Sequence, residues 1–573
     1  MAVWQPSEGA APAPESEVNL IDYTVTLNSK DDLDCFYNDM ETEGGDITIP
    51  NRAVEVSLRR PISRNTRYWL TPEEAEQVKQ DSRVLDVVPT AVLQMTKPLG
   101  VVSGTFNKSS TQNANHLNWG ILRHTEETNP QTWGSDGTQD QTTSVFIPGS
   151  GKNVDVVIVD GHIDPDHPEF AVNADGTGGS RVVQYNWFQH DVGSGTGTYN
   201  YGTGDYGDNH GAHVAGTVAG NTYGWAPDAN IYNIYIYGNT QGNGNIAADV
   251  YDYIRAWHAA KPINPDTGRR NPTIVNGSYG YVWDFANNPD LGSITSITYR
   301  GTTVTNAGGL TAQELIDGGI YATNSQPSVP FIPTAAAIDI ADTLDDGIII
   351  VGAAGNDSFR VVPDGDIDYN NTYSFTLQGT PRFDYQHRGS APGCVPGVIC
   401  VGALDTTTDL RKAFFSHSGT RIDAFAAGTY INSVVNDTSD NTGAGAVNDL
   451  RNPSYLVKKI SGTSMASPQV CGMLACVAEI DPSMTPSQAM QYIHNSYSFD
   501  LMRDDGFGRG IADAEDSTGN MIDSLYSLQG TYHEIKVIPK LRVENGATFP
   551  TKTFKPRPTS GCAYPRVKIR RKG

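Results

Sequence analysis

The chain has 573 residues, 38% of them hydrophobic, and a formal net charge of −24. Its hydrophobic content is sufficient for a large core, and it contains no apolar run of about 18 residues, the length that a membrane-spanning helix requires. The acidic excess argues against nucleic acid as the main partner and predicts a soluble surface that repels copies of itself.

The N-terminal segment, residues 1–17, is rich in alanine, proline and glutamate and is predicted to be flexible. It has neither the basic start nor the apolar stretch of a secretory signal peptide. The compartment is therefore left open by the sequence, since export and incorporation into a large assembly such as a virion are both compatible with it.

Residues 18–95 are predicted to form a small α+β domain. Strands are expected over residues 22–27, 53–58, 66–70 and 84–88, and helices over residues 30–41 and 71–82. Thr71, Pro72 and Glu74 supply the N-cap, the N1 proline and the N3 acid of a helix start. The order strand, helix, strand, strand, helix, strand is that of a ferredoxin-like domain. Residues 96–117, rich in glycine, serine, threonine and asparagine, are predicted to be a linker.

Three polar residues are predicted to lie at the ends of strands or at the start of a helix. An apolar run over residues 154–159 ends at Asp160, and a second over residues 347–354 ends just before Asn356. Both runs are predicted to be buried parallel strands, whose carboxyl ends form the edge where open α/β sheets place their sites. His210 lies in the first turn of a predicted helix that is rich in glycine.

Ser464 lies in the segment Gly-Thr-Ser-Met-Ala-Ser-Pro at residues 462–468, a tight turn that opens an apolar helix. A serine hydroxyl needs a base within hydrogen-bond reach to act as a nucleophile. Its backbone N–H, at a helix N-terminus, points to where an oxyanion would develop. An aspartate, a histidine, an asparagine amide and this serine are together the groups that acyl transfer requires.

These segments resemble the subtilisin-like serine proteases, which have the same Asp, His, Ser order. The similarity covers residues 118–517 and rests on segments in family order, at residues 119–123, 160–170, 210–217, 276–280, 351–356, 401–403, 415–419, 462–468 and 506–514. It implies a three-layer α/β domain with a mainly parallel central sheet. It also implies that Asp160 orients His210, that His210 is the general base, that Ser464 is the nucleophile, and that the Asn356 amide and the Ser464 N–H form the oxyanion hole.

The same resemblance implies how substrate and regulator bind. A polypeptide substrate is expected to extend along Ser278, Tyr279 and Gly280, and Asp357 suggests a preference for lysine or arginine before the cut. Residues 18–95 are expected to be an inhibitory pro-domain, removed by self-cleavage within residues 96–117. No cofactor is needed for catalysis. Structural calcium is common in the family, and oxygen-ligand chemistry offers Asp164, Asp166 and Asp205 as candidates.

Two departures from the family pattern stand out. Gly161 and His162 follow Asp160 where the family has a hydroxyl residue and then glycine, and His162 is predicted to face solvent from a turn. Residues 283–334 and 360–393 are predicted to be inserted surface loops, because glycine, asparagine, aspartate and threonine cluster in them.

The six cysteines are scattered and suggest buried thiols, although a bridge between Cys394 and Cys400 stays open. The C-terminal extension, residues 518–573, ends in a basic tail that either docks onto this protein, a partner or an anionic polymer, or is merely solvated.

Two other functions compete for these residues. A metal hydrolase would use His162, His167, His210 and His213 together with Asp160. Such an enzyme would more typically show the H-E-x-x-H pattern, which is absent. The chain could instead be a latent or non-catalytic scaffold or binding protein, such as a virion component. Such a protein would retain the aspartate, histidine, asparagine and serine without catalysing a reaction. Because all four chemical groups are present, the sequence favours a serine endopeptidase made as a zymogen.

Overall fold

The computed structural model describes fourteen segments of the chain, which are residues 20–42, 53–59, 63–89, 101–107, 113–125, 140–192, 195–201, 209–236, 249–285, 291–320, 328–377, 379–405, 412–436 and 445–495. They fall into two compact units, one within residues 1–96 and the other within residues 97–547. Within the described segments, no helix is both long enough and apolar enough to cross a membrane. The basic tail and the last matched segment, residues 506–514, lie outside the described residues.

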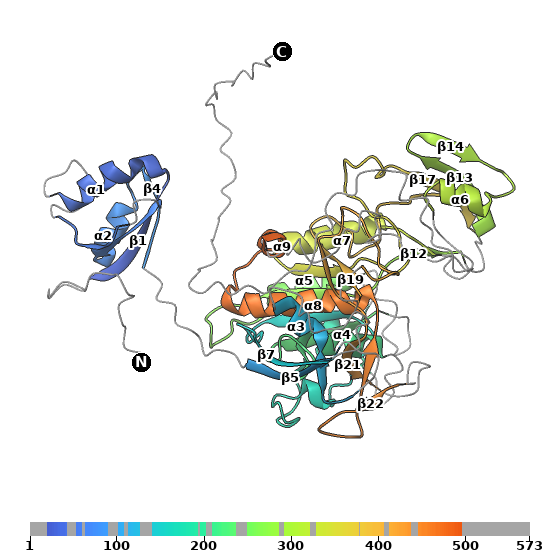
Figure 1. Cartoon of the computed structure of the whole chain (residues 1–573), viewed down its shortest axis with the longest axis horizontal. Helices are drawn as coiled ribbons and strands as arrows, with labels where there is room; N and C mark the ends of the chain where they lie inside the picture. The colour runs from blue at the N-terminus through green and yellow to red at the C-terminus, as the bar shows by residue number, and fades with distance from the viewer. Residues whose placement is uncertain are drawn as a thin grey trace, which may run out of the picture. The chain divides into compact units, whose positions relative to one another are not determined.

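The N-terminal unit has the predicted order of elements. Its antiparallel sheet has the strand order β2-β3-β1-β4, built from β1 (Ile21–Leu27), β2 (Val56–Leu58), β3 (Asn65–Leu70) and β4 (Val84–Pro89). Helices α1 (Leu33–Glu41) and α2 (Pro72–Val78) share one core with alternate residues of β1, so both cover the same face (Figure 1). The predicted capping box is present, because Thr71 and Glu74 each bond the other's backbone N–H.

The second unit is built on a parallel sheet of seven strands. Their order is β20-β19-β16-β11-β8-β10-β9, from β8 (Asp155–Asp160), β9 (Val182–Val183), β10 (Asn230–Tyr235), β11 (Thr273–Gly277), β16 (Ile349–Ala353), β19 (Ile399–Leu404) and β20 (Ala424–Ala427). Every residue of β8 is buried, which explains why residues 156–159 are all apolar rather than alternating with polar ones.

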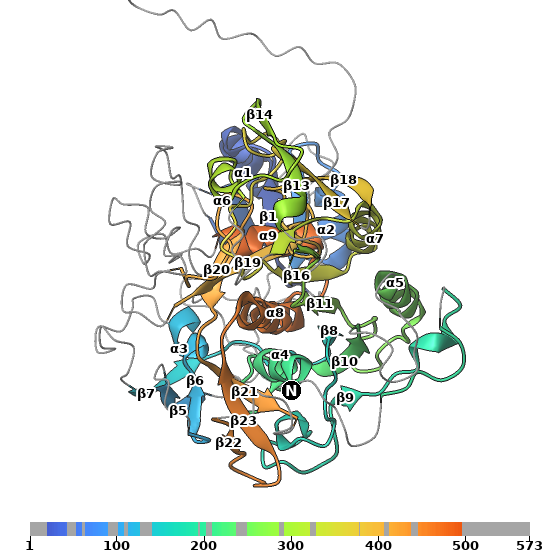
Figure 2. The same cartoon turned by 90° about the vertical axis from the view of Figure 1, so that its right-hand side faces the viewer.

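Helices cover both faces of this sheet. Val156 and Ile158 of β8 belong to one core with α4 (His210–Ala219) and α8 (Thr463–Ile480). Val157 and Val159 belong to the opposite core with α5 (Val250–Ala260) and α7 (Thr334–Asp345). Figure 2 shows these two helix pairs on opposite sides of β8, β10 and β11. The three-layer α/β fold predicted from the sequence is therefore confirmed.

Smaller elements complete the second unit. Helix α3 (Trp119–Thr125) packs near β20, and α9 (Pro486–Asn495) follows α8. A three-stranded sheet has the order β21-β23-β22, from β21 (Ile431–Val435), β22 (Val447–Asn448) and β23 (Leu456–Ile460). Strand β21 also lies along α4, the helix that begins at His210.

The prediction that residues 96–117 are simply a linker is wrong for part of that segment. Strand β5 (Val101–Asn107) pairs with β7 (Asp140–Phe146) in antiparallel fashion and with β6 (His116–Asn118) in parallel. Phe106 of β5 is fully buried in the main core. The strand thus belongs to the second unit, and the side chain of Phe106 anchors it in the core.

The two insertions are also more ordered than surface loops. They combine into an antiparallel sheet of order β14-β13-β17-β18, from β13 (Ile294–Tyr299), β14 (Thr302–Thr305), β17 (Thr372–Leu377) and β18 (Thr380–Tyr385), beside the pair β12 (Val282–Asp284) and β15 (Ser328–Pro330). Short helix α6 (Ala312–Asp317) completes this subdomain. It has a core of its own, which includes Ile297, Leu315 and Phe375. In β17 the buried Tyr373 and Phe375 alternate with the threonine and serine residues that suggested a loop.

The cysteines in the described segments are thiols. Cys394, Cys400, Cys471 and Cys476 are buried as predicted, and Cys35 is exposed. The sulfur atoms of Cys394 and Cys400 lie 3.8 Å apart, in contact but without a covalent bond.

Candidate active site

Asp160 and His210 form the central pair of the site. Asp160 is the last residue of β8 and is fully buried, whereas His210 opens α4 and its side chain is 31% exposed. The Nδ1 atom of His210 lies 2.7 Å from Oδ1 of Asp160, and the N–H of Gly161 donates to the same oxygen at 2.7 Å. Because Nδ1 faces the carboxylate, the other ring nitrogen, Nε2, is the one available for proton transfer.

Ser464 lies at the start of α8 and is almost completely buried at 8% exposure. Its hydroxyl donates to the carbonyl oxygen of Ser278 at 3.1 Å. The hydroxyl of Ser278 in turn donates to the carbonyl oxygen of Ser464 at 3.0 Å and contacts the hydroxyl of Ser467 at 2.9 Å. The segment after β11 is thereby held against the first turn of α8.

Asn356 follows β16 and is exposed. Its side-chain oxygen accepts hydrogen bonds from the backbone N–H of Thr463 at 2.9 Å and from the Thr463 hydroxyl at 2.8 Å. With the oxygen so engaged, the side-chain amide nitrogen is the donor that remains, next to the first residues of α8. The sequence placed Asn356 at a strand end but gave no sign of this contact with Thr463.

The predicted substrate-binding residues lie after β11. Tyr279 is half-buried, and its hydroxyl contacts that of Tyr251 on α5 at 3.1 Å. Gly280 is exposed and pairs with Pro392 through an isolated antiparallel bridge. Asp357, whose side chain is 23% exposed, has a carboxylate oxygen 3.7 Å from Nε2 of the buried His417. Ser278 connects this segment to Ser464 through the two hydrogen bonds described above.

The prediction for His162 is wrong. Its side chain is buried and stacks on Tyr235 of β10, with ring centroids 3.8 Å apart and planes 8° from parallel. Tyr235 is the parallel-strand partner of Asp160, so the ring packs beside the sheet edge rather than facing solvent. Burial lowers the pKa of His162 to about 4, which keeps the ring neutral at neutral pH.

Two histidines of the metal-hydrolase hypothesis, His167 and His213, are engaged with the backbone instead. The Nε2 atom of His213 contacts the carbonyl oxygens of Ile431 and Lys458, and His167 is bonded to backbone through both ring nitrogens. No group of three or more His, Cys, Asp or Glu residues in the described segments is arranged to hold a metal ion. The carboxylate of Asp164 accepts the N–H of Asp166 at 2.9 Å, which is a turn contact. The third calcium candidate, Asp205, lies outside the described residues.

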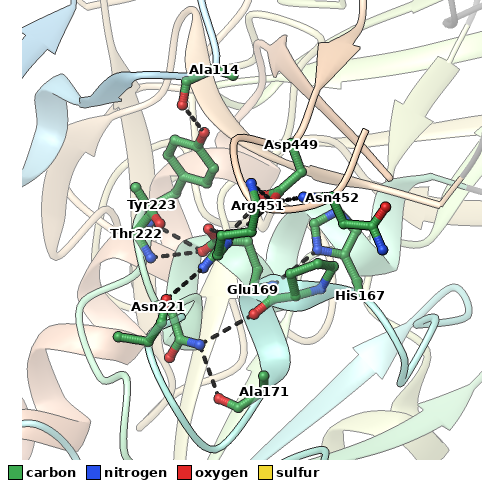
Figure 3. Close-up of polar contacts among 12 residues, drawn as sticks. Ala114, His167, Glu169, Ala171, Asn221, Thr222, Tyr223, Asp449, Arg451 and Asn452 are labelled. Atoms are coloured by element: carbon green, nitrogen blue, oxygen red, sulfur yellow. Dashed lines mark hydrogen bonds and ion pairs between the residues drawn. The ribbon is translucent and has the colours of Figure 1, made fainter. Parts of the chain in front are cut away.

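Sequence reasoning missed a buried ion-pair network next to the C-terminal end of α4, the helix that begins at His210 (Figure 3). The guanidinium of Arg451 contacts the carboxylates of both Glu169 and Asp449, and all three side chains are almost completely buried. The N–H of Thr222 also donates to Glu169, at 2.8 Å. The network joins the turn after β8, the loop after α4 and the segment between β22 and β23. The sequence carries no local sign of it, because Arg451 and Glu169 are 282 residues apart.

Comparison with known proteins now defines the family. The subtilase family profile, Peptidase_S8, matches residues 151–510, well over half of the chain. The chain therefore belongs to the subtilase family.

Individual relatives are distant. Subtilisin E of Bacillus subtilis is 24% identical over 371 residues, which cover 64% of this chain and 66% of that protein. Alkaline protease 1 of Aspergillus clavatus is 24% identical over 359 residues, which cover 62% of this chain and 59% of that protein. The chain thus spans less than two thirds of the length of these curated relatives. A solved cold adapted subtilisin-like serine proteinase is 20% identical, with a TM-score of 0.39 over 69% of this chain and 95% of that chain.

The burial of His162 leads to a prediction about stability. The ring of His162 binds a proton less readily in the folded protein than in the unfolded chain. Above about pH 6.5 the ring is neutral in both states and does not change the free energy of unfolding. As pH falls from about 6.5 toward 4, the ring lowers that free energy progressively. Replacing His162 with phenylalanine keeps the contact with Tyr235 and removes the proton site. We expect the free energy of unfolding of His162→Phe, measured with urea, to fall less steeply than that of the wild type between pH 6.5 and 4.

His190 provides the matched control. It also stacks on a tyrosine, Tyr185, but is half-exposed. The substitution His190→Phe should change the pH dependence less than His162→Phe does. Equal pH dependence in the wild type and His162→Phe would contradict the assignment of a buried neutral ring.

Proposed function

We propose that the protein is a serine endopeptidase that uses Asp160, His210 and Ser464. The observation that carries the proposal is the buried Asp160 carboxylate bonded to Nδ1 of His210 at 2.7 Å, in a subtilase domain that has a serine at the start of α8. This pairing leaves Nε2 of His210 as the proton acceptor that a serine nucleophile needs. The names of the relatives, which are subtilisins and proteases, agree with this activity.

The reaction proceeds in two halves. His210 takes the hydroxyl proton of Ser464 as the oxygen attacks the scissile carbonyl carbon, and Asp160 stabilises the imidazolium that forms. His210 then gives that proton to the leaving amine as the C–N bond breaks, which leaves an ester on Ser464. Water attacks the ester after losing a proton to His210, and Ser464 regains its proton as the acid product leaves.

The oxyanion of each tetrahedral intermediate is held by two donors. One is the backbone N–H of Ser464 at the helix N-terminus, and the other is the side-chain amide of Asn356. The bonds from Thr463 to the oxygen of Asn356 fix which way this amide points. The donor is therefore oriented before substrate arrives, and no reorganisation is required during the reaction.

Kinetics on a peptide substrate tests this function. Ser464→Ala should lower kcat by about 10⁶-fold. Asn356→Ala should lower kcat by about 10²- to 10³-fold with little change in KM, because the lost hydrogen bond forms only with the oxyanion. Asn173→Ala is the control, since Asn173 is also exposed and its side-chain amide donates to the hydroxyl of Thr177 at 3.0 Å. Unchanged turnover in Asn356→Ala would refute its role, and unchanged turnover in Ser464→Ala would refute the proposed function.

Substrate is proposed to extend along Ser278, Tyr279 and Gly280 as an added strand. Asp357 lies beside the oxyanion donor and favours a lysine or arginine before the cut. We expect Asp357→Asn to lower kcat/KM for such peptides relative to peptides with leucine at that position. Equal ratios in variant and wild type would exclude this carboxylate from substrate selection.

Residues 18–95 are proposed to act as an inhibitory pro-domain that the enzyme removes from itself. We place the cut within residues 96–100, because β5 begins at Val101 and is part of the catalytic unit. N-terminal sequencing of active wild type should find a start at or just before Val101, whereas Ser464→Ala should stay uncut. An active enzyme that keeps residues 18–95 attached would refute self-processing.

A further inference from the structure

The turn that carries Asp160 lacks an orienting side chain of its own. Gly161, the next residue, has no side-chain hydroxyl. Among the described residues, the carboxylate of Asp160 is bonded by the N–H of Gly161 and by Nδ1 of His210, and both bonds go to Oδ1. The direction of the carboxylate therefore depends on the backbone of the turn, and whatever fixes that backbone also fixes the bond to His210.

Asn436, the residue after β21, contacts this turn twice with one side chain. Its amide nitrogen donates to the carbonyl oxygen of His162 at 3.1 Å, and its side-chain oxygen accepts the N–H of Asp164 at 3.1 Å. Two bonds of opposite direction to a single side chain fix both the position and the rotation of the peptide segment between them.

Asn436 also contacts the residue that precedes His210. Its backbone N–H donates to the side-chain oxygen of Asn209 at 2.7 Å, and Asn209 is the residue immediately before His210. Strand β21 is itself tied to α4, because the Ser433 hydroxyl donates to the carbonyl oxygen of His213 at 2.8 Å. Asn436 thus stands at a fixed place relative to the start of α4.

The turn after β8 and the start of α4 are packed so closely that a small shift of one would displace the other. A Cβ atom on Gly211 would lie 2.3 Å from the carbonyl oxygen of Gly161, so the backbones are already in contact. Asn233 of β10 holds that same oxygen at 2.9 Å from the sheet side. Asn233 ties the turn to the sheet, whereas Asn436 ties it to the segment carrying His210.

We propose that Asn436 is a positioning residue of the active site, which aligns Asp160 with His210 by cross-linking the turn after β8 to the residue before α4. The inference rests on the proposed function. It assigns a role to a residue that touches neither substrate nor the reacting atoms, and it explains how the chain holds Asp160 with glycine at the position that follows.

The test compares variants on a peptide substrate, all in the same processing state. Asn436→Ala should lower kcat by about 10- to 100-fold, since misplacement of a catalytic group by about 1 Å costs up to that much. Its KM should stay within about twofold of the wild type, because Asn436 bonds to His162, Asp164 and Asn209, which are not among the proposed substrate-binding residues. Asn436→Asp keeps the acceptor for Asp164 and loses the donor to His162, so it should show a smaller loss and serves if the alanine variant does not fold.

A double-substitution cycle separates positioning from general stability. In an Asp160→Asn background the carboxylate is already gone, so Asn436→Ala should cause little further loss of kcat. Asn264→Ala is the matched control, because Asn264 is half-buried, bridges Asn153 and Asn271 and lies at the opposite end of the parallel strands. It should leave kcat unchanged relative to the wild type in the first background and relative to Asp160→Asn in the second.

The outcomes are distinguishable. Wild-type kcat in folded Asn436→Ala would overturn the inference, and so would an equal loss in the Asp160→Asn background. Both results leave the proposed function intact as long as wild type cleaves and Ser464→Ala does not. An inactive wild type would instead refute the proposed function.

Discussion

The hydrogen bond between Asp160 and His210 is the interaction on which the rest of the site depends. It joins residues 50 positions apart, and it pairs a carboxylate that is wholly removed from solvent. A buried carboxylate costs several kcal/mol unless it is paired and hydrogen-bonded. The surrounding structure therefore has to hold the two segments in one arrangement, which the sheet, α4 and the turn contacts together achieve.

The parallel sheet explains why the groups meet. Asp160 ends β8, Ser278 follows β11 and Asn356 follows β16, and these three strands are neighbours in the sheet. Parallel strands bring their carboxyl ends to one edge, and the first turn of α8 packs against that edge through Ser464 and Thr463. The sheet edge and the start of α8 thus bring together residues that are far apart in the sequence.

Sequence was informative wherever the signal is local. Apolar runs predicted β8 and β16, the capping residues at Thr71 predicted α2, and the residue types predicted the chemistry. It failed where the environment comes from elsewhere in the chain. The ring of His162 is covered by Tyr235 from another strand, and the carboxylate of Glu169 is paired with an arginine 282 residues away. Strand β5 was predicted to be a linker and the inserted sheet to be loops, because polar residues interrupt their apolar ones and only a few of the apolar side chains are buried.

Labelling with a fluorophosphonate probe tests the central claim most directly, because the probe reacts with a serine only when a base and an oxyanion hole activate it. Wild type, Ser464→Ala and His210→Ala would be treated in parallel, and the labelled peptide mapped by mass spectrometry. We predict one label on wild type, located at Ser464, and none at that position in either variant. An unlabelled Ser464 in folded, processed wild type, or equal labelling of His210→Ala, would contradict a triad-activated serine.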